Sequence, residues 1–354
     1  MRIVFLGDVS HPNAQSWIQG LKDTIPCAIV TWSLPSSPGP GGRIVRTLAW
    51  LRAVVRIRRM ISGLSPDLLI AYRTTSYGFL GALSGFHPLV VAAQGETDAW
   101  PLNSWAVGLK RSMARFCVRR ADLIHAWGDH IAQEQFALGA TRAKVLVRPR
   151  GIDRDKFFAA SPAAPVDALR LVCTRSLYPE YRHEVILDAV ASLATRGVPI
   201  SMDVVGEGPS MADLQRRAAA LGLAGRVRFH GRVRHDQLPE LLRQCNVYVS
   251  MPITEGVSAS LLEAMACGCY PIVTNLVANR YWISQHSNGT LVPIDDATAL
   301  GDALLAVWHD PDVIARAAVR NYALVRDEGS LKDNIALFVR NYQRLVAEAS
   351  GRHA

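Results

Sequence analysis

Short apolar runs alternate along the chain with longer segments whose apolar residues recur at helical spacing. Each run has the length and the Val, Ile and Leu content of a buried strand. Alternating strands and helices are typical of a doubly wound parallel sheet with helices on both faces. The strands predicted in the first half are Ile3–Leu6, Ala28–Trp32, Leu68–Ala71, Leu89–Ala93, Leu123–Ala126 and Val145–Arg148, and those in the second half are Leu169–Cys173, Ile200–Val205, Val227–His230, Val247–Met251 and Tyr270–Thr274.

Two domains are expected from the length of 354 residues. The Ala- and Pro-rich segment 159–165 has the composition of a linker, and the Pro- and Gly-rich segment 35–42 that of a mobile loop. We therefore expect Rossmann-like domains at 1–158 and 166–334, and a long amphipathic helix near the end of the chain. No run approaches the roughly 20 apolar residues that a membrane-spanning helix needs. The opening strand is too short for a secretory signal, so we expect a cytoplasmic protein with reduced cysteines.

The positive charge is concentrated in the first half. Residues 1–150 hold 18 Lys and Arg against 8 Asp and Glu, whereas the other 204 residues hold 21 against 22. Segment 43–60 predicts a basic amphipathic helix, and segment 110–120 is a second basic helical run. Nucleic acid is not expected as a partner, because no binding motif accompanies the charge. The alternatives are a peripheral contact with an anionic membrane surface and a solubilising charge bias without a partner.

The most informative stretch runs from Glu255 to Pro271. It follows a buried strand, and its apolar helix is ended by Gly268 and Pro271. The first turn of such a helix presents backbone N–H groups and a positive dipole end, which together favour an anion. Glu263 falls in the middle of this apolar helix. A buried carboxylate is costly unless a partner compensates it, so Glu263 is expected to have one.

The spacing of Glu255 and Glu263 before Ala-Met-Ala-Cys-Gly resembles the donor-binding signature of family 4 retaining glycosyltransferases of the GT-B fold, the superfamily of glycogen synthase and phosphatidylinositol mannosyltransferase. The resemblance implies two Rossmann-like domains facing a central cleft, with the C-terminal helix, about residues 335–354, crossing back to the N-terminal domain. It also implies an acceptor-binding N-terminal domain and a donor-binding C-terminal one. Glu255 would lie by the donor sugar and Glu263 at the ribose. The diphosphate would lie at the helix start, formed by Gly256, Val257, Ser258 and Ala259.

Further segments match the family with two departures. Segment 90–98 occupies the place of the family's Val-Val-x-x-His-Gly-x-Asp pattern, with Gln94 in the position of the histidine. Gln94 and Asp98 are the candidates, with Glu255, for the catalytic centre, although Asp98 is also suited to helix capping. Arg175 corresponds to the arginine that contacts the diphosphate. The lysine expected five residues later is replaced by Glu180, and Arg182 is the nearest basic substitute.

Two strand ends complete the predicted donor site. Gly206 lies in a glycine turn that resembles the family's loop near the nucleotide, and Arg232 follows the strand beside which the base would bind. The resemblance therefore predicts a sugar transfer from a nucleotide-diphosphate sugar to an acceptor hydroxyl, without a metal or another cofactor. A lipid-linked glycan of the cell envelope or of an exported polysaccharide is the expected acceptor. The alternatives are a nucleotide-sugar epimerase of the same fold and a non-catalytic nucleotide-sugar-binding subunit.

Overall fold

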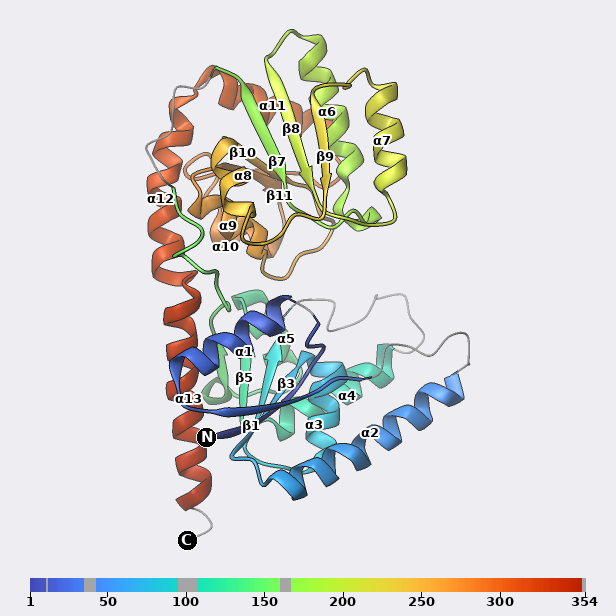
Figure 1. The fold of residues 1–354 in the computed structure, drawn as a ribbon, viewed down its shortest axis with the longest axis vertical. Coiled ribbons are helices and arrows are strands. Elements are labelled where there is room, and N and C mark those ends of the chain that lie inside the picture. Colours follow the sequence, from blue (N-terminus) through green and yellow to red (C-terminus); the bar gives the residue numbers. More distant parts are fainter. Residues whose placement is uncertain (11, 35–42, 95–106, 160–166, 352–354) are drawn as a thin grey trace. The chain divides into compact units, whose positions relative to one another are not determined.

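The computed structural model describes residues 1–10, 12–34, 43–94, 107–159 and 167–351 (Figure 1). The predicted loop at 35–42, most of the predicted linker at 159–165, and Asp98 lie outside these ranges. The chain forms two compact units. The first contains Met1–Arg150 and Leu331–Ala354, and the second contains Gly151–Ser330. The chain therefore passes twice between units, after Arg150 and after Ser330.

The first unit is built on a six-stranded parallel sheet in the order β2-β1-β3-β4-β5-β6. All six predicted strands are confirmed to within one residue at each end. The predicted basic segments are confirmed as helices α2 and α4, and the terminal helix as α13. The strands are β1 Arg2–Leu6, β2 Ala28–Trp32, β3 Leu68–Tyr72, β4 Leu89–Ala93, β5 Leu123–Ala126 and β6 Val145–Val147, and the helices are α1 Pro12–Thr24, α2 Arg43–Leu64, α3 Phe79–Ser84, α4 Val107–Arg120, α5 Asp129–Ala137 and α13 Leu331–Gly351, with a π-helix at Arg73–Gly78.

Aromatic packing attaches α13 to the first unit. The imidazole of His125 on β5 packs among Trp17 of α1 and two α13 rings, with centroids 4.3 Å from Phe338 and 5.3 Å from Tyr342. All four side chains are fully buried. Figure 1 shows α13 running beside α1. Burial on this scale stabilises by about 1.5–3 kcal/mol for each large apolar side chain, which explains why the last helix belongs to this unit.

The second unit contains another parallel sheet, in the order β12-β11-β10-β7-β8-β9. The five predicted strands are confirmed here, but the short strand β12 was not predicted. The strands are β7 Leu169–Cys173, β8 Ile200–Val205, β9 Val227–Gly231, β10 Val247–Ser250, β11 Tyr270–Thr274 and β12 Thr290–Val292, and the helices are α6 His183–Thr195, α7 Met211–Ala220, α8 Leu238–Gln244, α9 Ala259–Ala266, α10 Val277–Trp282, α11 Ala297–His309 and α12 Asp312–Glu328.

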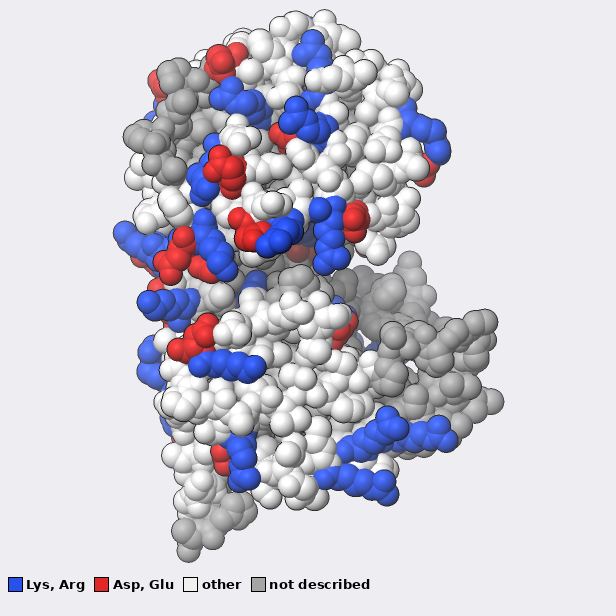
Figure 2. Space-filling model, in the orientation of Figure 1, with Lys and Arg blue, Asp and Glu red and all other residues white. Residues whose placement is uncertain are grey.

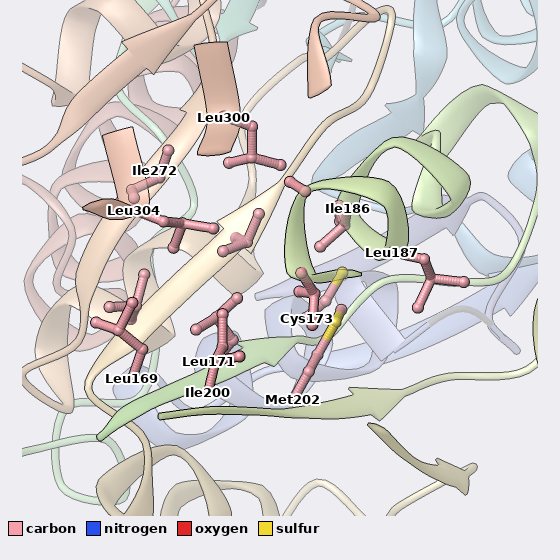
Figure 3. Packing of buried hydrophobic residues seen from close by; sticks show 14 of the residues in the cluster. Leu169, Leu171, Cys173, Ile186, Leu187, Ile200, Met202, Ile272, Leu300 and Leu304 are labelled. Carbon is pink, nitrogen blue, oxygen red and sulfur yellow. The ribbon is translucent and has the colours of Figure 1, made fainter. Parts of the chain in front are cut away.

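Successive residues of the central strands supply two cores, one on each face of this sheet. Leu171 of β7 belongs to a cluster with α6 and α11, where it packs near Ile186 and Leu304 (Figure 3). The next residue, Val172, belongs to the opposite cluster, which contains the apolar side chains of α9. A sheet covered on both faces requires continuous apolar strands, which is why these runs lack the alternation of a half-exposed strand. None of the described helices combines the length and apolar character that a bilayer-spanning segment requires.

Candidate functional site

The strand order of the second unit reverses between β7 and β10. Consecutive strands β7, β8 and β9 extend to one side, whereas β10, β11 and β12 extend to the other. In doubly wound sheets, ligands bind outside the carboxyl ends of the strands at this switch point, because the two flanking loops diverge there and leave a crevice. The loop after β7 begins at Thr174 and the loop after β10 at Met251. Predicted site residues occur on both loops.

Arg175 connects these two loops. Its Nη2 lies 2.7 Å from Oε2 of Glu255, and its Nη1 donates a 2.8 Å hydrogen bond to Oγ of Ser258. The guanidinium also lies over the ring of Tyr181, 4.4 Å from the centroid. These four residues are called the Arg175 cluster below. The predicted site residues Arg175, Glu255 and Ser258 are therefore brought together, although 80 or more positions separate Arg175 from the other two.

The Arg175–Glu255 pair is largely withdrawn from solvent, with 11% of each side chain exposed. Burial is the largest single effect on the pKa of Arg175 and lowers it, but Glu255, together with smaller effects of Tyr248, Tyr181 and Cys173, raises the pKa above its usual value. The guanidinium is thus charged at any working pH. A partly buried, fixed cation with a planar set of donors is suited to binding phosphate oxygens.

Helix α9 begins beside this cation. Ser258 has extended backbone angles and caps the helix, because its Oγ accepts a 3.3 Å hydrogen bond from the N–H of Leu261. The hydroxyl of Ser260 donates to the carbonyl of Thr174 at 3.0 Å, which ties the first turn to the loop after β7. The helix dipole and Arg175 therefore direct positive potential to the same place, as an anionic ligand requires.

The glycine turn after β8 packs directly against the loop that carries Arg175. A Cβ at Gly206, whose φ is +148°, would lie 2.1 Å from the carbonyl oxygen of Arg175. A Cβ at Gly208 would lie 2.3 Å from the carbonyl oxygen of Leu177. Backbone contacts of this kind leave no room for a side chain. Gly206 thus contributes to the site by allowing the glycine turn to pack closely against the loop that carries Arg175.

Glu263 has the partner that its burial demands. Its side chain is 8% exposed, and its Oε1 lies 2.8 Å from Nε2 of His235. His235 follows β9 by four residues, on the loop that leads into α8. Arg232 begins the same loop and is exposed. The sequence predicted that Glu263 has a partner but did not indicate His235. The two residues are 28 positions apart, and no local sequence pattern connects them.

Arg182 makes its ion pairs with residues outside the Arg175 cluster. Its Nε lies 2.8 Å from Asp295, and its Nη1 lies 3.5 Å from Glu184. Arg182 has a left-handed φ of 51° and precedes α6. Glu180, which stands in the lysine position, lies on the same loop, where its carbonyl accepts from the N–H of Ile253 at 3.0 Å.

No sequence pattern singles out His183, a buried histidine near Arg175. It begins α6, is 2% exposed, and makes no hydrogen bond through either ring nitrogen within the described part of the chain. Burial, with a smaller effect of the nearby Arg175, lowers its pKa to about 4. The imidazole is therefore neutral at pH 7.

Gln94 of the first unit directly follows β4, and its side chain is partly buried. The proposed roles of Gln94 and Asp98 stay predictions, as does the absence of a metal. No group of three or more His, Cys, Asp or Glu side chains among the described residues is arranged to hold a metal ion.

Comparison with known proteins gives the family. The sequence profile of the glycosyl transferases group 1 family matches residues 154–326, and that of the glycosyl transferase 4-like domain matches residues 21–151. The phosphatidylinositol N-acetylglucosaminyltransferase gpi3 subunit of Schizosaccharomyces pombe is 26% identical over 184 residues, which cover 51% of this chain and 40% of the relative. The phosphatidyl-myo-inositol mannosyltransferase of Mycobacterium tuberculosis is 32% identical over 237 residues, which cover 61% of this chain and 58% of the relative. The matches thus span about half the length of these relatives.

The fold is also shared with solved structures. A crystal structure of HepE from Anabaena in complex with UDP superposes with a TM-score of 0.78, covering 97% of this chain and 100% of that one, at 17% identity. The similarity at this identity establishes the fold. The sequence matches in both halves and the two doubly wound sheets confirm the predicted resemblance, and the chain belongs to the family 4-like glycosyltransferases of the GT-B fold.

Proposed function

We propose that the protein transfers a sugar from a nucleotide-diphosphate sugar to a hydroxyl group of an acceptor, with retention of the anomeric configuration. The observation that carries this proposal is the Arg175 cluster at the switch point of the second unit. It combines a permanent cation, a capped helix N-terminus and a largely buried carboxylate within hydrogen-bonding distance of one another. A diphosphate needs the first two, and a sugar hydroxyl is suited to the third.

In the proposed reaction, the bond between C1 of the sugar and the diphosphate oxygen breaks, and negative charge grows on the departing diphosphate. Arg175 and the first turn of α9 stabilise that charge. The acceptor oxygen bonds to C1 on the face that the diphosphate leaves, and the acceptor proton passes to a phosphate oxygen. Glu255 keeps the guanidinium in place through Oε2, while its Oε1 accepts from the N–H of Gly256 at 3.1 Å.

Thermal stabilisation by nucleotides tests the proposal. A ligand that binds the native state at a hundredfold excess over its Kd adds roughly 2.7 kcal/mol to the unfolding free energy. We expect UDP, GDP or ADP, and one of the corresponding nucleotide sugars, to raise Tm clearly. Release of the nucleoside diphosphate on addition of acceptor would follow. Absence of any shift across the panel would overturn the proposal, and binding without transfer or hydrolysis would favour a non-catalytic subunit.

We propose further that the acceptor is a lipid-linked glycan used for a cell-envelope or exported polysaccharide, and that the first unit meets it at an anionic membrane surface. The names of both curated relatives refer to phosphatidylinositol. Helices α2 and α4 contain no acidic residue, and both pack against α3. Figure 2 shows several Lys and Arg side chains where Figure 1 places α2. Apolar side chains accompany them, since Val55 is 49%, Leu109 64% and Phe116 39% exposed.

Vesicle binding tests the membrane contact. Neutralising Arg52, Arg56 and Arg59 to Gln is expected to weaken binding to vesicles rich in phosphatidylserine at least tenfold, because each basic residue near an anionic surface contributes about 1 kcal/mol. Arg58 is left intact because it donates to the carbonyl of Leu83 at 2.8 Å. The control variant loses the same charge from exposed positions elsewhere, through Arg216→Gln, Arg326→Gln and Arg344→Gln. If the α2 variant and the control variant bind the vesicles equally, the contact is not at α2.

A further inference from the structure

The pair formed by His235 and Glu263 has an unusual distribution of exposure. The carboxylate is 8% exposed, whereas the imidazole that binds it is 61% exposed. One face of the imidazole packs against the fully buried ring of Phe157, 5.0 Å between centroids. His235 is therefore fixed by an apolar neighbour on one side and by the carboxylate at Nε2, although much of the ring faces solvent.

The contact uses one of the two oxygens of Glu263. Nε2 of His235 meets Oε1 at 2.8 Å. With the proton on Nε2, the imidazole donates to Oε1 and sets the rotation of the carboxylate about its last bond. A carboxylate has two oxygens with about four acceptor positions, so Oε2 keeps its capacity to accept from a ligand.

The imidazole also supplies this carboxylate with a hydrogen-bond partner in apolar surroundings. Glu263 is surrounded by the apolar side chains of α9, all of them buried from Leu261 to Ala266. Burying a carboxylate in such surroundings without a donor is costly. Losing His235 would thus leave Glu263 without the donor that orients it.

His235 also links two segments of the second unit. The loop 232–237 follows β9, and the last residue of that strand, Gly231, accepts a 2.9 Å hydrogen bond from the N–H of Gly206. His235 therefore connects α9 to a loop that starts at the same sheet edge as the glycine turn beside Arg175. A ligand that spans Arg175 and Glu263 would be bounded by this loop.

We propose that His235 is a positioning residue for the ribose of the donor. By binding Oε1, it presents the charged Oε2 of Glu263 to the 2′- and 3′-hydroxyls. The inference rests on the proposed function, since it requires a nucleotide to supply the ribose diol. In this proposal, Glu263 and His235 together distinguish a ribose from a sugar that lacks these hydroxyls.

Ligand variation isolates this role. Binding is measured by calorimetry for whichever of UDP, GDP and ADP binds most tightly, and for its 2′,3′-dideoxy form. His235→Ala is expected to weaken binding of the ribonucleotide about tenfold and to leave binding of the dideoxy form within twofold of the parent protein. His235→Gln, whose amide nitrogen reaches the position of Nε2, is expected to restore most of the affinity.

A second residue and a matched control complete the test. Glu263→Gln should reproduce the loss, and combining it with His235→Ala should add little, because the histidine acts through the carboxylate. His87→Ala, which removes a histidine–carboxylate pair of 2.6 Å with Asp122 in the first unit, should leave both affinities unchanged. His235 is exposed enough that its variants are expected to fold.

The outcomes separate the two proposals. If the parent protein binds none of the three nucleotides, the proposed function fails and this inference fails with it. If it binds them but His235→Ala has no effect or tightens binding, the function stands and the positioning role is wrong. Equal losses for the ribonucleotide and its dideoxy form would likewise overturn it, since they would place the effect away from the ribose.

Discussion

The switch points of the two sheets have the same architecture but different contents. In the first unit the order reverses between β1 and β3, and in the second between β7 and β10. At the first, Asp8 after β1 accepts hydrogen bonds from the N–H and hydroxyl of Ser10, and a π-helix follows β3. At the second, Arg175 after β7 is bonded to Glu255 and Ser258, which follow β10.

This difference shows what the fold supplies and what the loops supply. Topology gives each unit diverging loops at the carboxyl ends of its strands. At the first switch point, Asp8 stabilises its own turn, whereas at the second a cation and a carboxylate connect separate loops. In the proposed function, the second arrangement supplies the charge that binds the diphosphate. Function therefore follows from the loop residues, as is general for folds that serve many reactions.

The largest expected effect concerns how closely the loops of the second unit pack. Gly206→Ala should cost on the order of 3 kcal/mol of unfolding free energy, because its Cβ would meet a backbone carbonyl at 2.1 Å. In the first unit, Gly7→Ala should cost less, since the nearest atom, at 2.8 Å, is the side chain of Phe5. Urea titrations of the two variants measure the comparison.

A third glycine separates steric conflict from backbone preference. Gly222 has φ +71° and no heavy atom within 4 Å of the place where an added methyl group would lie, so Gly222→Ala should cost only about 1 kcal/mol. If Gly206→Ala is no more destabilising than Gly222→Ala, the tight packing between the glycine turn and the Arg175 loop does not exist.

Pattern reasoning located the strands and the buried position of Glu263, because both depend on local sequence. Apolar runs identify strands that are covered on two faces. A carboxylate in the middle of an apolar helical segment is recognised as buried from its neighbours in the sequence. The sequence pattern did not predict which side chains pair with each other. His235 meets Glu263, and Arg182 meets Asp295, only through folding of distant segments. The strand β12 was also missed, because its run of two apolar residues, Leu291 and Val292, is too short to indicate a strand.

Each unit also buries a histidine, and both are expected to weaken the fold in acid. Burial lowers the pKa of His125 to about 3 and is the main cause that lowers that of His183 to about 4, whereas an unfolded histidine has a pKa near 6.5. The unfolded chain thus binds protons first, so stability is complete above pH 6.5 and falls as the pH drops toward 4. Each residue contributes about 3 kcal/mol to this loss by pH 4.

Replacing one histidine shows whether the two units respond separately. His183→Gln should flatten the decline of unfolding free energy between pH 6.5 and 4 in the second unit, and leave the contribution of His125 in place. His309→Gln, at an exposed position, is the control and should change nothing. An unaltered pH profile in the His183 variant would mean that this imidazole is protonated in the folded protein.

Kinetics test whether the charged switch point carries the reaction. Arg175→Ala should lower kcat/KM for the nucleotide sugar at least tenfold, about 1.4 kcal/mol, because the diphosphate loses its fixed cation. Arg217→Ala breaks an ion pair with Asp188 elsewhere in the second unit and should leave the kinetics unchanged. Equal kinetics for both variants, with folding verified by circular dichroism, would remove Arg175 from the site.

The smallest effect concerns what holds Arg175 in place at this switch point. Tyr181 contributes a cation–π contact at 4.4 Å, which is worth about 1 kcal/mol, whereas Glu255 and Ser258 contribute hydrogen bonds that survive its loss. Tyr181→Leu keeps an apolar group of similar reach and should raise KM for the nucleotide sugar two- to fivefold with little change in kcat. Tyr322→Leu removes a comparable contact with Arg154, 5.5 Å from the ring, and serves as the control. A tenfold or greater loss in the Tyr181 variant would mean that the tyrosine contacts the ligand itself, since a weakened cation–π contact alone is too small to produce it.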